Sequence, residues 1–471
     1  MLALNRIFTW TKAAYKRFCT PALLDAEHLL SRLNWQALKQ DFLTFTPELV
    51  GSSFSINDFS SYRHAADSPM GVMPFLVDAH ATKNQHYYDM WNTTPSKTRK
   101  PLHVMFLGLR GFPNVQGGIE SHVEHLAPLL VSFGCQVEVV VRSPYQPSTH
   151  AKQWCGVAFT RIWSPKSNKL EVIIHTFLGV MYAAIKRPDI LHIQAIGPAL
   201  MTPLARLMGL NVIVTHHGPD YERQKWGRVA RSVLKLGEWL GMRFAHGRIV
   251  ISHVIRDLVA NKHTVDAEII CNGVEIPSLD SPDTLLNQFG LQKNRYILIV
   301  SRLVPEKRHL DLIKAFNLAN IPNCKLAIVG SSDHPDGYVQ QLKHAVAHNP
   351  NVVLTGFQKG EVLNSLYAHA RLFVLPSSHE GLSISLLEAL SYGLKVLVSD
   401  IPANKVLSLK DDCYFAMGDV QQLSEKLTLC MQQTNTYEEK LLIRAWVANQ
   451  YNWRSIAQST YKHYQKLLST V

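Results

Sequence analysis

The chain has few of the features that mark a secreted, metal-binding or membrane-spanning protein. Its seven cysteines in 471 residues are an odd, scattered set without a C-x-x-C pair. Such a set lacks the spacing of a zinc or redox motif and predicts free thiols in a reducing cytosol. The longest apolar stretch, residues 172–185, contains His175 and is shorter than the roughly 20 residues that cross a bilayer. The sequence therefore predicts no transmembrane helix.

Acidic residues are scarce relative to basic ones. The chain has 36 Asp and Glu against 48 Lys and Arg, a formal net charge of +12. This excess favours anionic partners such as nucleic acid, an acidic membrane or a phosphorylated ligand, without choosing among them. A hydrophobic content of 46% and a charged content of 18% are typical of a globular protein and exclude a disordered one. At about 100 to 200 residues per domain, the length predicts two or three domains.

The first hundred residues differ from the rest of the chain. Residues 2–19 place aromatic and aliphatic side chains on one side of a helical wheel and four cations opposite, with no acidic residue. This pattern predicts a helix lying in an anionic membrane surface; packing of its apolar stripe on the rest of the protein is the alternative. Charges interrupt the apolar run and no cleavage-like site follows, which argues against a secretory signal. We assign no function to residues 21–100.

From Leu102 onward, short apolar runs alternate with longer amphipathic stretches. This alternation predicts parallel sheets covered by helices on both faces. Two doubly wound domains are expected, with a break at residues 277–290, where PSLDSP supplies turn residues. Because such sheets bind ligands beyond the carboxyl ends of their strands, two facing domains would enclose a cleft. The expected strands are 103–108, 136–141, 190–194, 212–217, 248–252 and 268–271, then 296–301, 325–330, 351–356, 372–376 and 396–400.

The strongest motif is SSHEGLSISLLEALSYG, residues 377–393. Glu380 and Glu388 are eight residues apart, which is about 12 Å of rise if the segment is helical throughout. That spacing is too long for one proton-transfer centre, but it suits two carboxylates that hold opposite parts of an extended ligand. Backbone N–H groups at the helix start would face an anion such as a diphosphate. The alternative is that Glu380 caps the helix and Glu388 is solvated.

A second motif, SRLVPEKRHLDLIKAF at residues 301–316, follows the expected strand YILIV. Arg302 and Lys307 would point about 140° apart on a regular helix, so they converge only if the residues between them form a loop. Pro305 predicts that loop. An Arg fork and a Lys point charge can together neutralise a diphosphate leaving group. Ordinary surface charges are the alternative, but both motifs follow strands of one domain, which favours a shared site.

Three histidines at strand ends, His192, His216 and His217, are candidates for a reaction centre, although a strand-end histidine is often a hydrogen-bonded structural residue. The sequence contains neither a Walker motif nor G-x-G-x-x-G, which argues against a kinase or a dehydrogenase. Metal-ligand spacing and a strand-end D-x-D are also absent, so we expect no metal and no cofactor. Without an aromatic-interleaved basic patch or a helix-turn-helix pattern, nucleic acid is not an expected partner.

Taken together, these motifs resemble a known enzyme family. HEGLSISLLEA resembles the E-x7-E motif of retaining GT-B glycosyltransferases of the family-four type, and SRLVPEKRHLDLI resembles their phosphate-clamping segment. Residues 108–130, 166–179, 189–199 and 215–227 resemble a bacterial subfamily that includes rhamnosyltransferases of capsule and polysaccharide assembly. The resemblance spans roughly residues 102–471. It implies four segments: an N-terminal extension (1–100), a Rossmann-like acceptor domain (101–280), a Rossmann-like nucleotide-sugar domain (281–440) and C-terminal helices that return toward the first domain (441–471).

The resemblance also implies roles for individual residues. Glu380 would hold donor-sugar hydroxyls, Glu388 the ribose, and Arg302 with Lys307 the diphosphate. The implied catalytic residues are Arg302, Lys307, Glu380, His217 and His192. The implied donor-binding residues are Gly117 and Gly118 in a tight loop near the diphosphate, Gly356 and Phe357 beside the nucleobase, and Arg302, Lys307, Glu380, Gly381, Leu382, Ser383 and Glu388. Asp220 and Lys225 would lie on the acceptor side.

The expected function is metal-independent transfer of a hexosyl or rhamnosyl residue from a nucleoside diphosphate sugar to a hydroxyl of a glycan, with retention. A lipid-linked acceptor in surface polysaccharide biosynthesis, for capsule or lipopolysaccharide, would reconcile this chemistry with residues 2–19. The protein would then be cytoplasmic and peripheral at the inner face of the bacterial plasma membrane. The alternatives are a sugar-nucleotide epimerase or hydrolase of the same fold, or a catalytically silent membrane scaffold.

Overall fold

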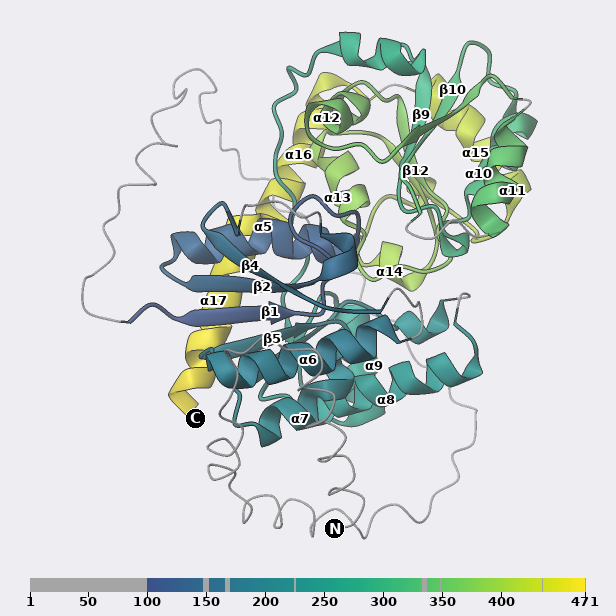
Figure 1. The fold of residues 1–471 in the computed structure, drawn as a ribbon. Coiled ribbons are helices and arrows are strands. Elements are labelled where there is room, and N and C mark those ends of the chain that lie inside the picture. The colour runs from purple at the N-terminus through teal and green to yellow at the C-terminus, as the bar shows by residue number, and fades with distance from the viewer. Residues whose placement is uncertain are drawn as a thin grey trace, which may run out of the picture. The chain divides into compact units, whose positions relative to one another are not determined.

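The computed structural model describes residues 100–146, 152–165, 170–223, 226–332, 337–347, 349–433 and 435–470. The expected helix at residues 2–19 and the candidate Lys225 lie outside these ranges. The described residues form two sheets (Figure 1), one with strand order β3-β4-β2-β1-β5-β6-β7-β8 and one with order β11-β10-β9-β12-β13-β14.

The first sheet is parallel except where β3 pairs antiparallel with β4. Its central strands are runs of Val, Ile, Leu and Phe that are buried on both faces, as a covered parallel sheet requires. Its strands are β1 (His103–Leu107), β2 (Gln136–Arg142), β3 (Gln153–Trp154), β4 (Val157–Ile162), β5 (Ile190–Gln194), β6 (Val212–His216), β7 (Gly247–Val250) and β8 (Glu268–Ile269). The helices between them are α5 (Gly118–Ser132), α6 (Glu171–Lys186), α7 (Thr202–Leu207), α8 (Arg228–Phe244) and α9 (His253–His263), with short 3-10 turns η1 (Ser143–Tyr145), η2 (Pro198–Met201) and η3 (Asp220–Glu222).

The second sheet is parallel throughout. From β9 the chain winds outward to β10 and β11, then returns to β12 on the other side of β9 and continues to β13 and β14. Its strands are β9 (Tyr296–Val300), β10 (Lys325–Val329), β11 (Val352–Gly356), β12 (Leu372–Leu375), β13 (Val396–Ser399) and β14 (Tyr414–Phe415). The other elements are η4 (Asp283–Phe289), η5 (Pro305–Lys307), α10 (His309–Ala319), α11 (Gly337–Val346), α12 (Gly360–Ala368), α13 (Ile384–Ser391), α14 (Pro402–Lys405), η6 (Asp411–Cys413) and α15 (Val420–Gln432).

The order of winding places a topological switch point in each sheet. In the second sheet it lies between β9 and β12, and in the first between β1 and β5. Loops that follow neighbouring strands diverge there and leave a crevice at the carboxyl ends, which is where open α/β sheets bind ligands. The residues after β9 and β12 are those of the two strongest motifs, so topology brings them to the same edge.

The structure confirms the expected α/β class and every expected strand, with ends that differ by one or two residues. Three further strands were missed. Two of them, β3 and β14, have two residues each, which is too short for a periodic pattern. The third, β4, lies near an edge of the sheet and is half exposed, so it lacks the continuous apolar run of its neighbours.

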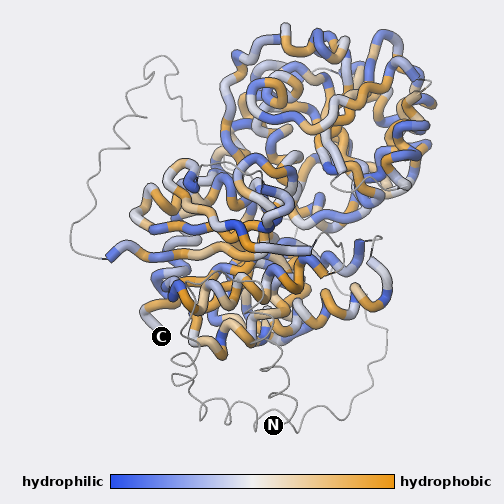
Figure 2. The backbone as a smooth tube through the Cα atoms, in the orientation of Figure 1, coloured by the Kyte–Doolittle hydropathy of each residue, from blue (hydrophilic) through white to orange (hydrophobic). Residues whose placement is uncertain are grey.

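The chain ends in two helices, α16 (Tyr437–Gln450) and α17 (Trp453–Thr470). Helix α16 packs on α13 of the second sheet, and α17 packs on α5. Trp453, Ile456 and Tyr464 of α17 are buried in one hydrophobic cluster with Val104 and Phe106 of β1. The last helix thus completes the core of the first sheet, and Figure 2 shows its hydrophobic positions interrupted by hydrophilic ones, as expected for a helix with one buried face.

The apolar stretch at residues 172–185 forms most of α6, where His175 is fully buried. Within the ranges that the structure describes, no helix is both long and apolar enough to pass through a membrane.

Substitution of Gly237 in α8 tests how closely this helix packs on the turn at Ile196. A Cβ atom at Gly237 would lie 2.3 Å from the carbonyl oxygen of Ile196. Alanine stabilises a helix interior by up to about 1 kcal/mol relative to glycine, but here the clash must move the helix or the turn. We expect Gly237→Ala to lower the free energy of unfolding by about 1–3 kcal/mol, measured by urea unfolding followed by circular dichroism.

The matched control is Ser232→Ala, at an exposed position of the same helix, which should leave stability unchanged or slightly raised. Equal or greater stability of Gly237→Ala would show that α8 is not held against Ile196.

Candidate functional site

The switch point of the second sheet joins Lys307 to Glu380. Strand β9 leads into η5, which begins at Pro305 and is ended by Arg308 in the left-handed conformation, with φ 52°. This turn is the loop that Pro305 predicts, and it directs Lys307 toward the segment after β12. The Lys307 ammonium lies 2.5 Å from Oε1 of Glu380, and both side chains are largely buried. Two residues from the two strongest motifs therefore form one ion pair.

Arg302 follows β9, and both positively and negatively charged side chains act on its guanidinium. Burial lowers the pKa of its guanidinium below the usual range, and the positive charges of Arg223 and Arg110 lower it further, while Glu120 and Glu306 oppose them. A cation whose charged form is destabilised by burial and by like charges gains most from an anion brought beside it.

The start of α13 follows directly after Glu380. Ser383 caps this helix by accepting a hydrogen bond from the N–H of Leu386 at 3.4 Å, so the cap is Ser383 and not Glu380. The carbonyl of Leu382 accepts a hydrogen bond of 2.7 Å from Asn272. A Cβ atom at Gly381 would lie 2.1 Å from the carbonyl oxygen of His217, so only glycine allows this close approach of two backbones.

Glu388 lies within α13 and is not a solvated surface residue. It is partly buried, and Tyr367 donates a hydrogen bond of 2.7 Å to its carboxylate. Burial raises its pKa above the usual range, although the Tyr367 hydroxyl opposes this shift. Because Glu380 stands before the cap, the segment between the two carboxylates is not helical throughout, and the axial rise of a continuous helix does not apply to it.

Gly356 and Phe357 stand at the carboxyl end of β11. The carbonyl of Gly356 accepts a hydrogen bond of 2.8 Å from the N–H of Gly330, and Phe357 is exposed. Because the sheet is parallel, this end lies on the same edge as Arg302 and Glu380. The expected contact with a nucleobase stays a prediction.

In the first sheet, the loop after β1 is built around an ion pair that our sequence reasoning missed. Arg110 binds Glu120 in the first turn of α5, with Nε 3.0 Å from Oε1. Burial opposes ionisation of Glu120, but the charge and hydrogen bonds of Arg110 outweigh it and lower its pKa to about 2. A Cβ atom at Gly117 would lie 2.0 Å from Oε2 of Glu120, whereas one at Gly118 would meet open space. Gly117 therefore makes room for the ion pair, and the exposed Gly118 leaves the helix start accessible.

The same loop bonds to the segment after β10. The side-chain oxygen of Gln116 accepts hydrogen bonds from the N–H of Ser331 at 3.1 Å and from its hydroxyl at 2.7 Å. Both residues belong to one compact unit of the chain. Gln116 gave no signal in the sequence beyond its place before two glycines.

His217 is held in place by Gln194 and by the ring of His122. Its Nε2 lies 2.7 Å from the side-chain oxygen of Gln194, and its ring meets that of His122 edge to face at 5.1 Å. Burial lowers its pKa well below the usual value, and nearby His122 and His192 add to the effect. Since its backbone lies against Gly381, His217 stands beside the Glu380 segment.

His192 is placed differently, with both ring nitrogens engaged. Nδ1 lies 2.7 Å from the Tyr464 hydroxyl and Nε2 lies 2.7 Å from the Thr215 hydroxyl. The side chain is buried, and burial lowers its pKa well below the usual value. This is the geometry of a structural histidine that ties β5 to α17 and β6; its expected catalytic role stays a prediction.

The loop that carries His217 rests on a buried carboxylate, Glu238 of α8. The N–H of Gly218 donates to Nδ1 of His216 at 3.0 Å, so Nε2 of that ring carries a proton and donates to Glu238 at 3.2 Å. Lys262 binds the other carboxylate oxygen. Burial opposes ionisation of Glu238, but the hydrogen bonds from His216, His263 and Lys262 outweigh it and lower its pKa below the usual range. The network fixes the tautomer of His216 and with it the loop.

On the expected acceptor side, Asp220 lies in η3 and pairs with Arg223 at 2.7 Å. Arg223 also lies 4.0 Å from Glu306, whose buried carboxylate oxygens have no hydrogen-bond partner among the described residues. Arg223 and Glu306 were not predicted as site residues; both stand inside the quoted motifs, which was the available signal. Lys225 is outside the described ranges.

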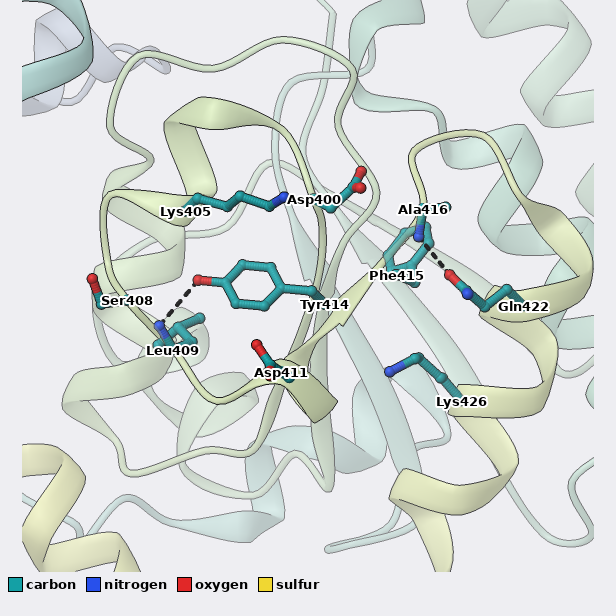
Figure 3. A pocket seen from close by; sticks show the side chains of 10 residues that line it. All are labelled: Asp400, Lys405, Ser408, Leu409, Asp411, Tyr414, Phe415, Ala416, Gln422 and Lys426. Carbon is teal, nitrogen blue, oxygen red and sulfur yellow. Dashed lines mark hydrogen bonds between the residues drawn. The ribbon is translucent and has the colours of Figure 1, made fainter. Parts of the chain in front are cut away.

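A surface hollow at the β14 edge of the second sheet is not this site. Figure 3 shows it between α14, η6, β14 and α15, where Tyr414 accepts a hydrogen bond from the N–H of Leu409 at 3.0 Å. None of the expected site residues lines it. Among the residues that the structure describes, no three His, Cys, Asp or Glu side chains are grouped as metal ligands.

Replacing Glu238 tests the buried network. Removing the carboxylate charge leaves Lys262 without its counter-ion and His216 without a charged acceptor, so we expect Glu238→Gln to lower the free energy of unfolding at pH 7 by about 3 kcal/mol. Because the folded pKa lies below the unfolded value of about 4.3, this stabilisation is present above that pH and is lost as the pH falls. The difference from wild type, measured by urea unfolding, should therefore shrink between pH 5 and pH 3.

The control is Glu425→Gln, an exposed residue of α15, for which we expect a change within about 0.5 kcal/mol. A Glu238→Gln deficit that did not vary with pH would mean that the carboxylate contributes by packing and not by charge.

Comparison with known proteins agrees with the two-sheet architecture. Residues 116–276 match the family model "Glycosyltransferase Family 4", and residues 283–441 match "Glycosyl transferases group 1". Over 248 residues the chain is 28% identical to the UDP-Gal:alpha-D-GlcNAc-diphosphoundecaprenol alpha-1,3-galactosyltransferase of Escherichia coli, an alignment that covers 48% of this chain and 62% of that relative. The chain spans between 29% and 62% of the length of three curated relatives that it matches.

Two solved structures are similar in fold. Sucrose-phosphate synthase from Thermosynechococcus elongatus has a TM-score of 0.66 at 18% identity, covering 79% of this chain and 100% of that one. Anabaena Alr3699/HepE in complex with UDP-glucose has a TM-score of 0.63 at 17% identity, covering 78% of this chain and 100% of that one. These likenesses confirm the expected GT-B fold. With both domain matches in order along the sequence, the chain belongs to the family-4-type glycosyltransferases.

Proposed function

We propose that the chain transfers a glycosyl residue from a nucleoside diphosphate sugar to a hydroxyl of a glycan, with retention at the anomeric carbon. The observation that carries this proposal is the Lys307–Glu380 ion pair at the switch point of the second sheet, where Arg302 follows β9 at the same edge. In the absence of donor, Glu380 is the counter-ion of Lys307. A bound diphosphate takes over that charge and leaves the Glu380 carboxylate to accept hydrogen bonds from sugar hydroxyls.

Stabilisation of the leaving group is the largest catalytic effect in this proposal. Negative charge develops on the diphosphate as the glycosidic bond breaks, and preorganised donors aimed at that charge lower the barrier. Arg302 offers a planar fork, Lys307 a point charge, and the start of α13 free backbone N–H groups. Their positive charge replaces a divalent ion, so the proposed reaction is metal-independent.

Glu388 and the carboxyl end of β11 provide the other proposed contacts with the donor. Glu388 accepts hydrogen bonds from the ribose hydroxyls, and Tyr367, which already donates to it, fixes the orientation of the carboxylate. The backbone at Gly356 and Phe357 faces the nucleobase. The transferred group is a hexosyl or rhamnosyl residue.

Retention is proposed to occur on one face of the sugar. The bond from the anomeric carbon to the phosphate oxygen breaks while a bond to the acceptor oxygen forms on the same side. The acceptor proton passes to the departing phosphate oxygen, so no enzymic nucleophile is required. His217 remains a neutral hydrogen-bonding group at the sugar, consistent with its lowered pKa, and exclusion of water prevents hydrolysis of the donor.

The names of similar proteins support a lipid-linked acceptor. The Escherichia coli relative is named for a UDP-galactose donor and a diphosphoundecaprenol-linked acceptor, and another relative is an O-antigen chain mannosyltransferase of the same organism. We propose that this chain elongates a lipid-linked glycan in surface polysaccharide biosynthesis, at the inner face of the plasma membrane. Residues 2–19 would then bind that membrane as a basic amphipathic helix.

The proposed roles of the two cations can be tested by substitution. We expect Arg302→Ala or Lys307→Ala to reduce the turnover number by about 100-fold to 1000-fold, because each removes a donor to the leaving diphosphate. Donor affinity should fall less, since the sugar, ribose and base contacts remain. The measurement is acceptor-dependent release of nucleoside diphosphate, with donor binding followed by calorimetry across a panel of nucleotide sugars.

Lys314→Ala is the matched control, because Lys314 is an exposed lysine of α10 in the same domain; its activity should equal wild type. Full activity of either site variant would refute the assigned roles. Conversion of the donor without acceptor would indicate an epimerase or a hydrolase, and absence of both activities with intact vesicle binding would indicate a scaffold.

The membrane proposal makes a separate prediction. Replacing Lys12 and Lys16 by Gln removes two cations from the polar face of the expected helix, and each cation near an anionic surface strengthens binding about fivefold. We expect the double variant to bind phosphatidylglycerol-containing vesicles about 25-fold more weakly, measured by co-sedimentation. Unchanged binding would show that residues 2–19 are not the membrane anchor.

A further inference from the structure

Helix α8 presents an outward face that no role assigned so far explains. Its inner face is fixed, since Gly237, Glu238, Gly241 and Met242 are buried and the helix packs on η2, η3 and α9. Its outer face carries large apolar side chains: Val229 is 79% exposed, Leu236 48% and Trp239 38%. Figure 1 shows α8 on the outside of the first sheet.

The same face is basic and has no acid. The exposed residues around the apolar ones are Arg228, Arg231, Lys235 and Arg243, and the only carboxylate of α8 is the buried Glu238. At 100° per residue, Val229, Leu236 and Trp239 fall on one side with the cations interleaved and flanking. We name this set of seven residues the α8 face.

The positions of these cations oppose the stability of the helix itself. Arg228 and Arg231 stand in the first turn, which contains no acidic residue. The positive end of the helix dipole disfavours cations there. Arginines at such a position, next to exposed Val229, are therefore not explained by folding and point to an external anion.

The positive surface continues past the end of α8. Arg248 donates hydrogen bonds to the last carbonyls of the helix, at Met242 and Arg243. Burial lowers the pKa of Arg248, and the charges of Arg243 and Arg206 lower it further, with Asp266 as the opposing charge. Three arginines from three elements thus lie near one another at this end.

From these observations we propose that the α8 face docks on an anionic lipid bilayer, with Val229, Leu236 and Trp239 entering the interface and the cations at the headgroups. A helix that combines apolar side chains, a Trp and flanking cations has the composition of an interfacial helix. A second copy of the chain is a poorer partner, because a two-fold contact would oppose cations to cations. Nucleic acid would use the cations but would leave the aliphatic side chains in water.

The location suits the proposed chemistry, and to this extent the inference rests on the proposed function. Helix α8 begins just after η3, which holds the acceptor-side residue Asp220, and Tyr221 of η3 lies under Lys235, 5.6 Å from its ammonium. A bilayer on the α8 face would bring a lipid-linked glycan to the acceptor side of the first domain. The α8 face is distinct in sequence from residues 2–19 and would act as a second contact that sets orientation.

Two double variants of the full-length protein test this inference by co-sedimentation with phosphatidylglycerol-containing vesicles. Arg231→Gln with Lys235→Gln should weaken binding about 25-fold, at about fivefold per cation. Val229→Gln with Leu236→Gln should weaken it by about tenfold or more, because aliphatic burial is lost. The matched control is Lys462→Gln with Lys466→Gln, which removes the same charge from exposed positions of α17 and should change binding less than about twofold.

Vesicle binding by both α8 pairs equal to that of the α17 control would overturn the inference. Weakening by the charge pair alone would also overturn it, since that is the behaviour of a polyanion site. Transfer to a water-soluble acceptor analogue should be unchanged in all three variants if the α8 face acts at the membrane. The wild type and all three variants could fail to bind donor while the two α8 variants still bind vesicles more weakly than the control. That result would support the membrane surface and refute the proposed function.

Discussion

The ion pair between Lys307 and Glu380 is the interaction on which the architecture of the site depends. It requires that β9 and β12 be neighbours, that Pro305 break the helix that would otherwise point Lys307 away, and that Glu380 precede the cap at Ser383. A buried ion pair repays its desolvation only with good geometry and further hydrogen bonds. An anion that offers Lys307 a stronger partner can reorganise such a pair, which is the physical basis of the donor-binding role proposed for it.

The first sheet contributes loops that are held firmly in place, whereas the second contributes the charged residues Arg302, Lys307 and Glu380. Two buried carboxylates, Glu120 and Glu238, are kept ionised by Arg110 and by the His216–Lys262 network. Each fixes a loop after a strand, one before α5 and one that carries His217. Neither carboxylate is well placed to react, because its hydrogen-bonding capacity is already used. Their effect is to hold backbone groups and a neutral imidazole in position, so that little reorganisation accompanies the reaction.

The sequence predicted the strands and the convergence of the two motifs for clear physical reasons. Buried parallel strands read as apolar runs, and strand order at a switch point brings loops together regardless of their sequence separation. Arg110 with Glu120, and Glu238 with His216, could not be predicted in this way. Each pair joins an ordinary surface-type residue to a partner on another element, and only the packing of α5 and α8 shows that the carboxylates are buried.

His192 is another residue whose contacts could not be predicted from the sequence. Its strand-end position made it a candidate for the reaction centre, but the sequence could not show that the hydroxyl groups of Tyr464 and Thr215 lie at both ring nitrogens. Tyr464 is 272 residues away in the chain and reaches His192 only because α17 returns to the first sheet. Periodicity can show that α17 has an apolar face, but it cannot show which strand that face covers.

The net charge of +12 is explained by cations at the surface and not by those of the site. Buried cations are largely paired: Lys307 with Glu380, Arg110 with Glu120, and Arg142 with Glu171 at 2.9 Å. Such pairs contribute nothing to the net charge. Exposed cations carry the surplus, and the α8 face contributes to it, because the only carboxylate of α8 is the buried Glu238. A basic exterior of this kind favours anionic surfaces, while Lys307 of the proposed donor site is already paired with Glu380 and needs an anion that can replace this carboxylate.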